Sequence, residues 1–205
     1  MRASTSMRAG ALLDRDGTII VDHGYVGSVE RVELIPGAAQ AIARLNRAGL
    51  PVAVVTNQAG VARGYYGIDD VEAVHRYLEQ RLAEHEAHVD LFLYCPYHPE
   101  GTVAPFSRAS DDRKPGPGMA RAAALALGLD LESSWVVGDS AADIGMARAV
   151  GAQAIHVGDE PLADDGYSAH LPDLAAAASF ILERLAILER LAILERLAIP
   201  ERAAR

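Results

Sequence analysis

The chain has 205 residues, half of them hydrophobic and 23% charged, and its formal net charge at pH 7 is −9. This length and composition predict one globular domain with a sizeable core, and they exclude a disordered chain. The acidic balance argues against nucleic acid or an anionic membrane as a partner. A single cysteine excludes an internal disulfide, and the first residues lack the apolar segment of a signal peptide. We therefore expect a cytoplasmic protein.

Short apolar segments alternate along the chain with longer segments of helical character. Strands are predicted at residues 9–13, 51–56, 91–95, 134–138 and 154–157, and helices at residues 37–48, 69–88, 118–127 and 141–150. Repeated strand and helix units of this kind predict a parallel sheet with helices on its faces. The expected fold class is therefore α/β, with a doubly wound parallel sheet.

The first predicted strand ends in Asp14-Arg15-Asp16-Gly17-Thr18. Two carboxylates at positions i and i+2 on a strand exit can share one hard cation, and Mg²⁺ takes about six oxygen ligands. We predict that Asp14 attacks phosphorus as the nucleophile and that Asp16 protonates the leaving oxygen. An ordinary surface turn is the alternative, since Asp and Gly are common turn residues.

Polar side chains also follow the second predicted strand, where the sequence reads Thr56-Asn57-Gln58. The Thr56 hydroxyl and the two amides can receive phosphoryl oxygens as negative charge spreads over them. Because ligands of open α/β sheets bind beyond the carboxyl ends of the strands, we expect this cluster beside Asp14 and Asp16. Taken alone, the segment would be interpreted as a turn.

The fourth predicted strand leads into Asp139 and, four residues later, Asp143. Asp139 is a third predicted Mg²⁺ ligand, together with Asp14 and Asp16. Asp143 is predicted to hold a metal-bound water or to orient Lys114. A helix N-cap is the structural alternative for Asp139, and both roles can hold together.

Lys114 is the only lysine among 19 basic residues, and it follows Arg113 in a segment rich in proline and glycine. A compact ammonium suits one phosphate oxygen, whereas the planar guanidinium of Arg113 can clamp a second phosphate or a hydroxyl. We therefore predict that both residues contact substrate. The alternative for Lys114 is that a single lysine is present by chance, without a role in the site. The alternative for Arg113 is an ion pair at the solvated surface.

The remaining histidines and the cysteine carry weaker signals. Cys95 and His98 suggest a pair of metal ligands, but structural zinc needs about four nitrogen or sulfur ligands and no second cysteine exists. Zinc is therefore not expected. His75, His85 and His88 belong to a charged helical segment, so we expect them to be solvated.

The C-terminus repeats Ile-Leu-Glu-Arg-Leu-Ala three times from Ile181 and then reads Ile-Pro-Glu-Arg. We predict a phosphatase domain over residues 1–180 and a low-complexity helical tail over residues 181–205, ended by Pro200. A six-residue step rotates about 240° net around a helix, so no clean apolar stripe is expected. The tail is interpreted as extra helix, and helix-mediated self-association is the alternative.

Together these motifs resemble the haloacid dehalogenase superfamily of phosphatases. The segment 14–18 looks like its first motif, Thr56 like its second, Lys114 like its third, and Asp139 with Asp143 like its fourth. Within the superfamily the chain is similar to the heptose 1,7-bisphosphate 7-phosphatases. The resemblance implies a Rossmann-like fold without a large cap domain and a monomer. It also implies Mg²⁺-dependent removal of the 7-phosphate from a small phosphorylated sugar through an aspartyl-phosphate.

The resemblance also implies which residues contact the substrate. The matching segments are Asp22-His23-Gly24-Tyr25, Thr56-Asn57-Gln58-Ala59 and Arg113-Lys114. Relatives usually bind zinc at four positions of the long loop after the third strand, and here those positions are Cys95, Tyr97, Ser110 and Asp112. Three of the four ligands are replaced. A family lysine after Asp139 is Ser140 in this chain, which removes one positive contact.

Two other functions stay open at this level. Histidinol-phosphate phosphatases share the architecture and the long loop, although the segment 22–25 favours the heptose enzyme by resemblance. A non-catalytic sugar-phosphate-binding or assembly protein is the alternative from another class, with the C-terminal repeat as its interaction element. A panel of substrates and the exchange of Asp14 distinguish these two functions from that of a heptose bisphosphate phosphatase.

Overall fold

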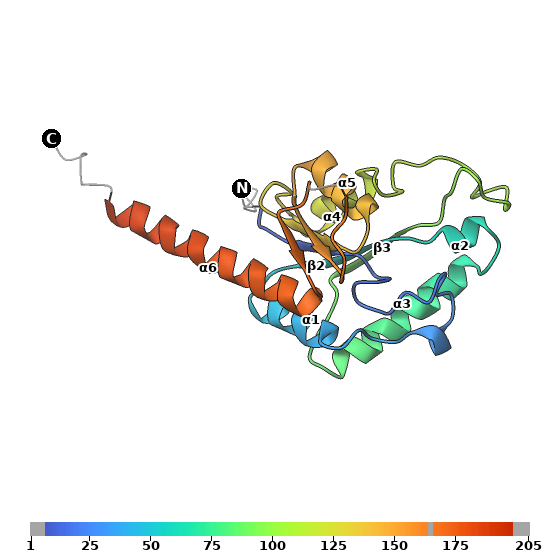
Figure 1. The fold of residues 1–205 in the computed structure, drawn as a ribbon, viewed down its shortest axis with the longest axis horizontal. Helices are drawn as coiled ribbons and strands as arrows, with labels where there is room; N and C mark the ends of the chain where they lie inside the picture. Colours follow the sequence, from blue (N-terminus) through green and yellow to red (C-terminus); the bar gives the residue numbers. More distant parts are fainter. Residues whose placement is uncertain (1–6, 164–165, 199–205) are drawn as a thin grey trace, which may run out of the picture.

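The computed structural model describes residues 7–163 and 166–198 of the chain. A six-stranded sheet in the order β3-β2-β1-β4-β5-β6 forms its centre, and all neighbouring strands are parallel (Figure 1). The strands are β1 (Ala11–Leu13), β2 (Val52–Asn57), β3 (Leu91–Cys95), β4 (Trp135–Gly138), β5 (Gln153–Val157) and β6 (Ala169–Leu171). The predicted α/β class with a doubly wound parallel sheet is confirmed. Strand β6 was not predicted.

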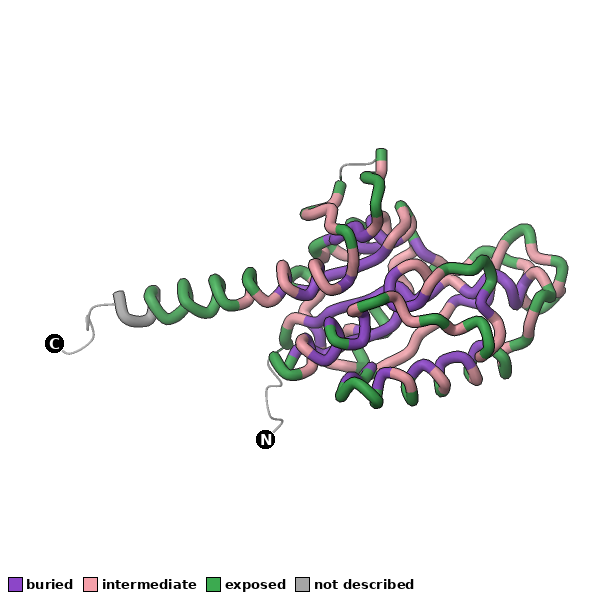
Figure 2. Tube along the Cα trace, turned by 60° about the horizontal axis from the view of Figure 1, so that its bottom comes forward, coloured by how far each residue is buried: buried purple, intermediate pink, exposed green. Residues whose placement is uncertain are grey.

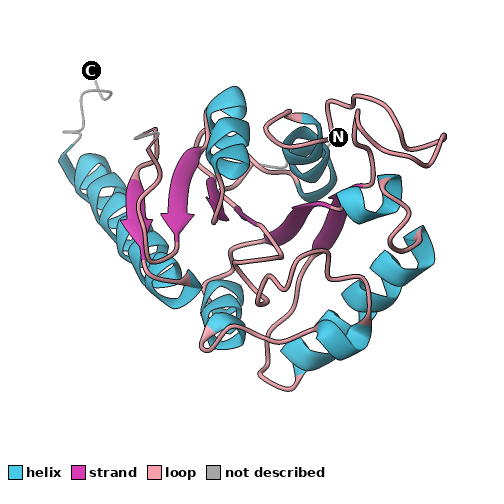
Figure 3. Cartoon of the chain, turned by 45° about the vertical axis from the view of Figure 1, so that its right-hand side comes forward, coloured by secondary structure: helices cyan, strands magenta, loops and turns pink. Residues whose placement is uncertain are grey.

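Helices cover both faces of this sheet (Figure 3). They are η1 (Val29–Arg31), α1 (Ala38–Arg47), α2 (Ala59–Ala62), α3 (Ile68–Ala83), α4 (Gly118–Leu127), α5 (Ala141–Val150) and α6 (Leu174–Ala198). Helix α3 ends earlier than the predicted residue 88. The chain turns at Glu86, whose φ is 58°, and this turn lets Ala87 and Val89 pack into the core.

Alternation along each strand divides the core into two layers. Side chains of successive strand residues point to opposite faces, so the apolar runs serve both layers. Leu12 and Val136 pack on the side of α4 and α5, whereas Leu13 and Val137 pack on the side of α1 and α6. Burial on both faces explains why these strands are continuously apolar instead of alternating with polar residues.

The direction of the winding reverses between β1 and β4. From β1 the chain builds β2 and β3 on one side, and it then crosses to build β4, β5 and β6 on the other. Such a reversal leaves a crevice at the carboxyl ends of the two central strands, where α/β proteins bind ligands. Residues that follow β1 and β4 directly are therefore brought together.

Two connections are long, residues 14–37 between β1 and α1 and residues 96–117 between β3 and α4, and the first of them folds onto the edge of the sheet. After β1, residue Ile20 bridges to Asp16 and to Leu34, and Ile19 and Val26 are buried in the core. Across the described residues neither connection contains a folded cap domain, in agreement with the prediction. In the described part of the chain, the site is therefore bordered by loops and by the ends of strands and helices, without a cap domain.

Helix α6 begins at Leu174, before the predicted domain boundary, and continues as one helix through Ala198. Its first turns pack on α1 and the sheet through Leu174, Ala178 and Ile181, and its later turns project from the body (Figure 2). The predicted end at Pro200 lies outside the described residues, and the boundary at residue 180 stays a prediction. In the described part of the chain, no helix combines the length and the apolar character needed to cross a membrane.

Candidate active site

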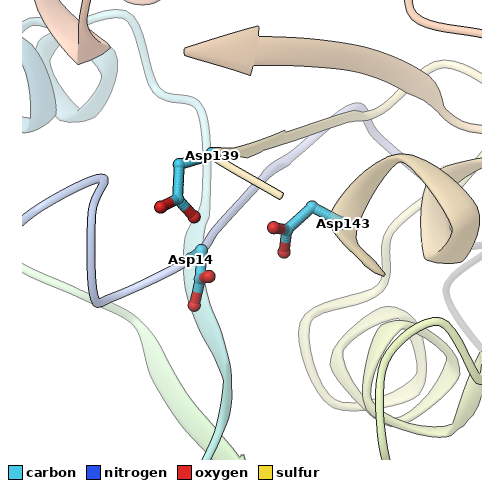
Figure 4. Close-up of side chains that lie close together, drawn as sticks. All are labelled: Asp14, Asp139 and Asp143. Carbon is cyan, nitrogen blue, oxygen red and sulfur yellow. The ribbon is translucent and has the colours of Figure 1, made fainter. Parts of the chain in front are cut away.

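Three carboxylates meet at the carboxyl edge of the sheet (Figure 4). Asp14 follows β1, Asp139 follows the neighbouring strand β4, and Asp143 lies in the first turn of α5. One ligand oxygen from each lies within 4.8 Å of the others. Parallel pairing of β1 with β4 therefore assembles the cluster from distant parts of the sequence.

A glycine is needed for this close approach. Gly17 has a φ of 76°, in the left-handed region that favours glycine, and a Cβ there would overlap the carboxylate of Asp139. Gly138 is similarly close to the side chain of Asp143. Both glycines let the chain pass directly against the carboxylates that it must hold.

Lys114 sits within this cluster and is almost completely buried. Its Nζ lies 2.9 Å from Asp14 Oδ1 and 2.6 Å from Asp143 Oδ1. Asn57 holds the main chain of Lys114, because Lys114 N–H donates to Asn57 Oδ1 at 3.0 Å and Asn57 Nδ2 donates back to the Lys114 carbonyl at 3.1 Å. The end of β2 thus positions the only lysine of the chain.

Burial dominates the electrostatics of the cluster. It raises the pKa of Asp14 to about 7 against the opposing charge of Lys114, and it raises the pKa of Asp139 to about 6, with a further contribution from Asp143. Burial alone would lower the pKa of Lys114, but Asp14 and Asp143 outweigh it and raise that pKa. Three carboxylates share one ammonium, so negative charge is in excess. An all-oxygen, electronegative site of this kind suits Mg²⁺.

Asp16 is held apart from these carboxylates. Arg15 Nε donates to Asp16 Oδ2 at 3.1 Å and Arg15 Nη2 donates to Asp16 Oδ1 at 3.0 Å. Gln58 Nε2 also donates to Asp16 Oδ2, at 2.9 Å. Both carboxylate oxygens are therefore occupied by protein donors, and the predicted ligation of a metal by Asp16 stays a prediction.

A cavity of about 220 Å³ opens over the cluster. It is lined by Asp14, Asp16, Asp22, Thr56, Asn57, Lys114, Asp139 and Ser140. Ser140 is the N-cap residue of α5, and its hydroxyl and its main-chain N–H donate to Asp143 Oδ2 at 2.5 Å and 3.2 Å. The cavity brings together all the predicted catalytic residues and metal ligands, whereas Asp143 is not among its lining residues.

The predicted substrate loop reaches this cavity only in part. Asp22 lines it, whereas His23, Gly24 and Tyr25 are exposed farther out. The loop is ordered by Arg31, whose Nη2 donates to the carbonyls of His23 at 2.6 Å and Gly24 at 3.0 Å. A second cavity of about 400 Å³ lies at its tip, lined by Gly24, Tyr25, Gly27, Ser28, Arg31, Tyr65 and Tyr66.

Other predicted contacts lie behind the lining of the first cavity. Gln58 and Ala59 are buried, and Gln58 reaches the cavity through Asp16. Arg113 is half-buried beside Lys114, and its Nη1 has no hydrogen-bond partner within the described part of the chain. A buried guanidinium nitrogen without a partner is able to donate to an incoming oxygen, and the contact of Arg113 with substrate stays a prediction.

The loop after β3 is held by aromatic packing around Tyr97. Cys95 is buried, and its thiol faces the Tyr97 carbonyl at 3.8 Å. The Tyr97 ring lies 6.0 Å from the ring of Phe106, and the Arg108 guanidinium lies 3.6 Å above the Tyr97 ring. These contacts link the outgoing and returning parts of the loop, and the expected absence of zinc stays a prediction.

The structure adds residues that the sequence did not single out. Arg15 is completely buried and paired with Asp16, Tyr66 bonds Gln58, and His156 Nε2 lies 3.1 Å from the Asp139 carbonyl. The position of Arg15 between two aspartates in the sequence could have indicated that it pairs with one of them. Neither Tyr66 nor His156 stands near the motifs in sequence, so only the folded chain identifies them.

The expectation that His75 is solvated is wrong. His75 is buried on the inner face of α3, and its ring stacks on Phe92 at 4.8 Å and meets Tyr94 edge-on at 5.6 Å. Its position continues the buried face formed by Val71 and Leu78. The charged neighbours along the sequence point to the other side of the helix, as helical periodicity requires.

Comparisons with known proteins agree with this geometry. A family model described as HAD-hydrolase-like matches residues 112–185. The D-glycero-beta-D-manno-heptose-1,7-bisphosphate 7-phosphatase of Rhodopseudomonas palustris is 46% identical over 151 residues, which cover 74% of this chain and 84% of the relative. The Escherichia coli K12 protein of the same name is 40% identical over 174 residues, 85% of this chain and 88% of the relative.

A solved structure is similar over nearly the whole molecule. The D,D-heptose 1,7-bisphosphate phosphatase of B. bronchiseptica, crystallised with magnesium and phosphate, superposes with a TM-score of 0.75 at 33% identity. The alignment covers 87% of this chain and 99% of that one. These relatives are phosphatases that share the fold. The chain therefore belongs to the heptose 1,7-bisphosphate 7-phosphatase family of haloacid dehalogenase-like hydrolases, and it is a phosphoric monoester hydrolase.

Proposed function

We propose that this protein removes the 7-phosphate of D-glycero-beta-D-manno-heptose 1,7-bisphosphate and leaves the 1-phosphate, in the synthesis of nucleotide-activated heptose. The names of the relatives support this substrate and this anomer. The observation that carries the chemistry is the buried contact of Lys114 Nζ with Asp14 Oδ1 at 2.9 Å, beneath a cavity open to substrate. A carboxylate beside a cation at the bottom of a cavity is suited to attack a phosphate dianion.

Mg²⁺ is the proposed cofactor, held by the carboxylates of Asp14 and Asp139. Asp16 is the third proposed ligand, and its Oδ1 accepts only one of the hydrogen bonds from Arg15 and Gln58 that hold this carboxylate. Asp143 would orient Lys114, to which it lies 2.6 Å away. When bound, the cation supplies positive charge that reduces repulsion between Asp14 and the phosphate. The magnesium in the B. bronchiseptica structure supports this choice.

In the first step, a carboxylate oxygen of Asp14 bonds to phosphorus while the bond from phosphorus to the sugar oxygen breaks. The Asp16 carboxyl gives its proton to that departing oxygen. Lys114 and the hydroxyl of Thr56 are placed to receive charge that spreads over the phosphoryl oxygens. The products of this step are the sugar with a free hydroxyl at carbon 7 and an aspartyl-phosphate on Asp14.

In the second step, water attacks the phosphorus of the aspartyl-phosphate. Asp16, now a carboxylate, takes a proton from the water, and the bond between phosphorus and Asp14 breaks. Inorganic phosphate leaves and both aspartates return to their starting forms. The net reaction is hydrolysis of one phosphate ester, so no further reactant is needed.

A substrate panel tests the proposal. Phosphate release with Mg²⁺ is measured from both anomers of heptose 1,7-bisphosphate, from histidinol phosphate and from fructose 1,6-bisphosphate. We expect strong preference for the beta anomer, and Asp14→Asn should abolish turnover because an amide cannot form the aspartyl-phosphate. Preference for histidinol phosphate would replace the proposed substrate, and unchanged activity of Asp14→Asn would contradict the mechanism.

A further inference from the structure

The outer part of α6, residues 187–194, exposes several large apolar side chains to solvent. Ile187, Leu188, Leu191, Ile193 and Leu194 are each between 51% and 60% exposed, on a helix that projects away from the body (Figures 1 and 2). Large apolar side chains grouped on one exposed segment mark an interaction site, whereas single ones are ordinary. The segment needs a partner that the body of the same chain does not supply.

A groove of about 520 Å³ runs beside this segment. Its apolar wall consists of Trp135 and Phe180 together with Ile187, Leu188 and Leu191. Trp135 is the first residue of β4, so the groove lies at the opposite end of the sheet from Asp14 and Asp139, which follow strand ends. An occupant of the groove leaves the active site open.

We propose that the occupant is the outer part of α6 from a second copy of the chain, lying antiparallel to the first. The groove carries one acid, Glu132, and one base, Arg184. A nucleic acid or an anionic membrane would require basic walls. A helix that carries acidic and basic side chains among apolar ones matches the composition of this groove. The outer part of α6, with its repeated Glu-Arg pairs, is such a helix.

The positions of the charges select the antiparallel direction. Glu183 and Arg190 are exposed, lie on the same flank of the helix seven residues apart, and form no ion pair with another described residue. An antiparallel pair centred between Ala186 and Ile187 places Glu183 of each helix level with Arg190 of the other. A parallel pair in register would place like charges together, which is unfavourable.

Two matched variants test the proposal by sedimentation of the full chain over a range of concentrations. Leu191 lines the groove and is 51% exposed, whereas Ile193 is 55% exposed and lies about 200° around the helix from it. We expect the wild type and Ile193→Glu to form dimers with similar dissociation constants. Leu191→Glu should weaken the dimer by about tenfold or more, because it buries an unpaired carboxylate.

Phosphatase activity serves as the control for folding, since both positions are remote from the active site. A wild type that stays monomeric at high micromolar concentration overturns the proposal, whatever else the groove binds. Equal weakening by both variants overturns it too, because it would indicate unspecific apolar association. Dimers of Leu191→Glu as tight as those of the wild type would show that the contact lies elsewhere.

Discussion

At the scale of single residues, Tyr66 reaches the proposed acid through one intervening side chain. Its hydroxyl donates to Gln58 Oε1 at 2.8 Å, and Gln58 Nε2 donates to Asp16 Oδ2 at 2.9 Å. Burial raises the pKa of Tyr66 to about 12, so the hydroxyl remains protonated and is a donor. Tyr66 thereby fixes which end of the Gln58 amide faces Asp16.

We expect Tyr66→Phe to lower kcat about tenfold for the sugar phosphate, because the Gln58 amide loses its orientation and Asp16 is less well placed. Hydrolysis of p-nitrophenyl phosphate should change much less, since its leaving group needs little protonation. Steady-state kinetics with both substrates make the comparison. Tyr65→Phe, at an exposed ring in the same second cavity, is the matched control. Equal losses on both substrates would indicate a purely structural role.

His75 is a second residue whose surroundings have a measurable consequence. Burial lowers its pKa to about 3, with a further contribution from the charge of Arg15, and its Nε2 has no hydrogen-bond partner among the described residues. In the folded protein the ring is therefore neutral throughout the usual pH range. The unfolded chain binds a proton below its ordinary pKa of about 6.5.

This difference predicts how stability depends on pH. The contribution of neutral His75 is fully present above about pH 6.5 and is lost as the pH falls from there toward 3, because only the unfolded state takes up the proton. When the pH falls from about 7.5 to 5, the free energy of unfolding should decrease in the wild type by about 2 kcal/mol more than it does in His75→Phe. Urea unfolding at both pH values measures it. His85→Phe, at an exposed position, should keep the wild-type slope, and parallel curves for all three proteins would contradict the account.

At the scale of elements, the loop after β3 shows how packing holds a long connection in place. Tyr97 is half-buried against the core on the α4 side and also contacts Phe106 and Arg108. His98 N–H donates to the Phe106 carbonyl at 3.1 Å, which ties the outgoing chain to the returning one. The end of this loop carries Arg113 and Lys114, so its shape bears on the proposed contacts of these two residues with phosphate.

We expect Tyr97→Ala to reduce the free energy of unfolding by about 2 kcal/mol, since an aromatic ring with neighbours on three sides is removed. A zinc-selective chelator should leave the melting temperature of the wild type unchanged. Thermal and urea unfolding test both expectations. A loss of stability on chelation would mean that a metal, rather than aromatic packing, holds the loop.

At the scale of the whole molecule, the carboxylate cluster couples folding to cation binding. β1, β4 and α5 each supply one carboxylate, and only the assembled sheet brings their oxygens within 4.8 Å. Burial of these like charges opposes folding, and a cation that binds only the folded state offsets the cost. Stability should therefore depend on Mg²⁺ even without substrate.

We expect Mg²⁺ to stabilise the wild type by up to about 2.7 kcal/mol at a concentration a hundredfold above its dissociation constant. Asp139→Asn should be more stable than the wild type without metal, because one like charge is gone, and it should gain much less from Mg²⁺. Thermal unfolding with Mg²⁺, compared with NaCl at equal ionic strength, measures both effects. An equal gain in the exposed variant Asp159→Asn and in Asp139→Asn would place the cation elsewhere.

The sequence by itself determined the parallel α/β sheet and the edge at which Asp14 and Asp139 meet. Apolar strand segments, helical periodicity and glycine stops are local properties, and parallel winding then brings all strand exits to one side. Most predicted elements accordingly lie within a few residues of the observed ones. The ends of helices were less accurate, as at α3, because the turn at Glu86 depends on what Ala87 and Val89 pack against.

Only the tertiary structure decided where individual side chains point. It turned the Asp16 carboxylate toward Arg15 and Gln58, buried His75 against β3, and chose which side of α6 lines the groove. Each of these outcomes depends on neighbours from distant parts of the chain, which no local pattern contains. A side chain adopts the direction in which its polar atoms find partners and its apolar atoms find contacts, and those partners exist only once the chain has folded.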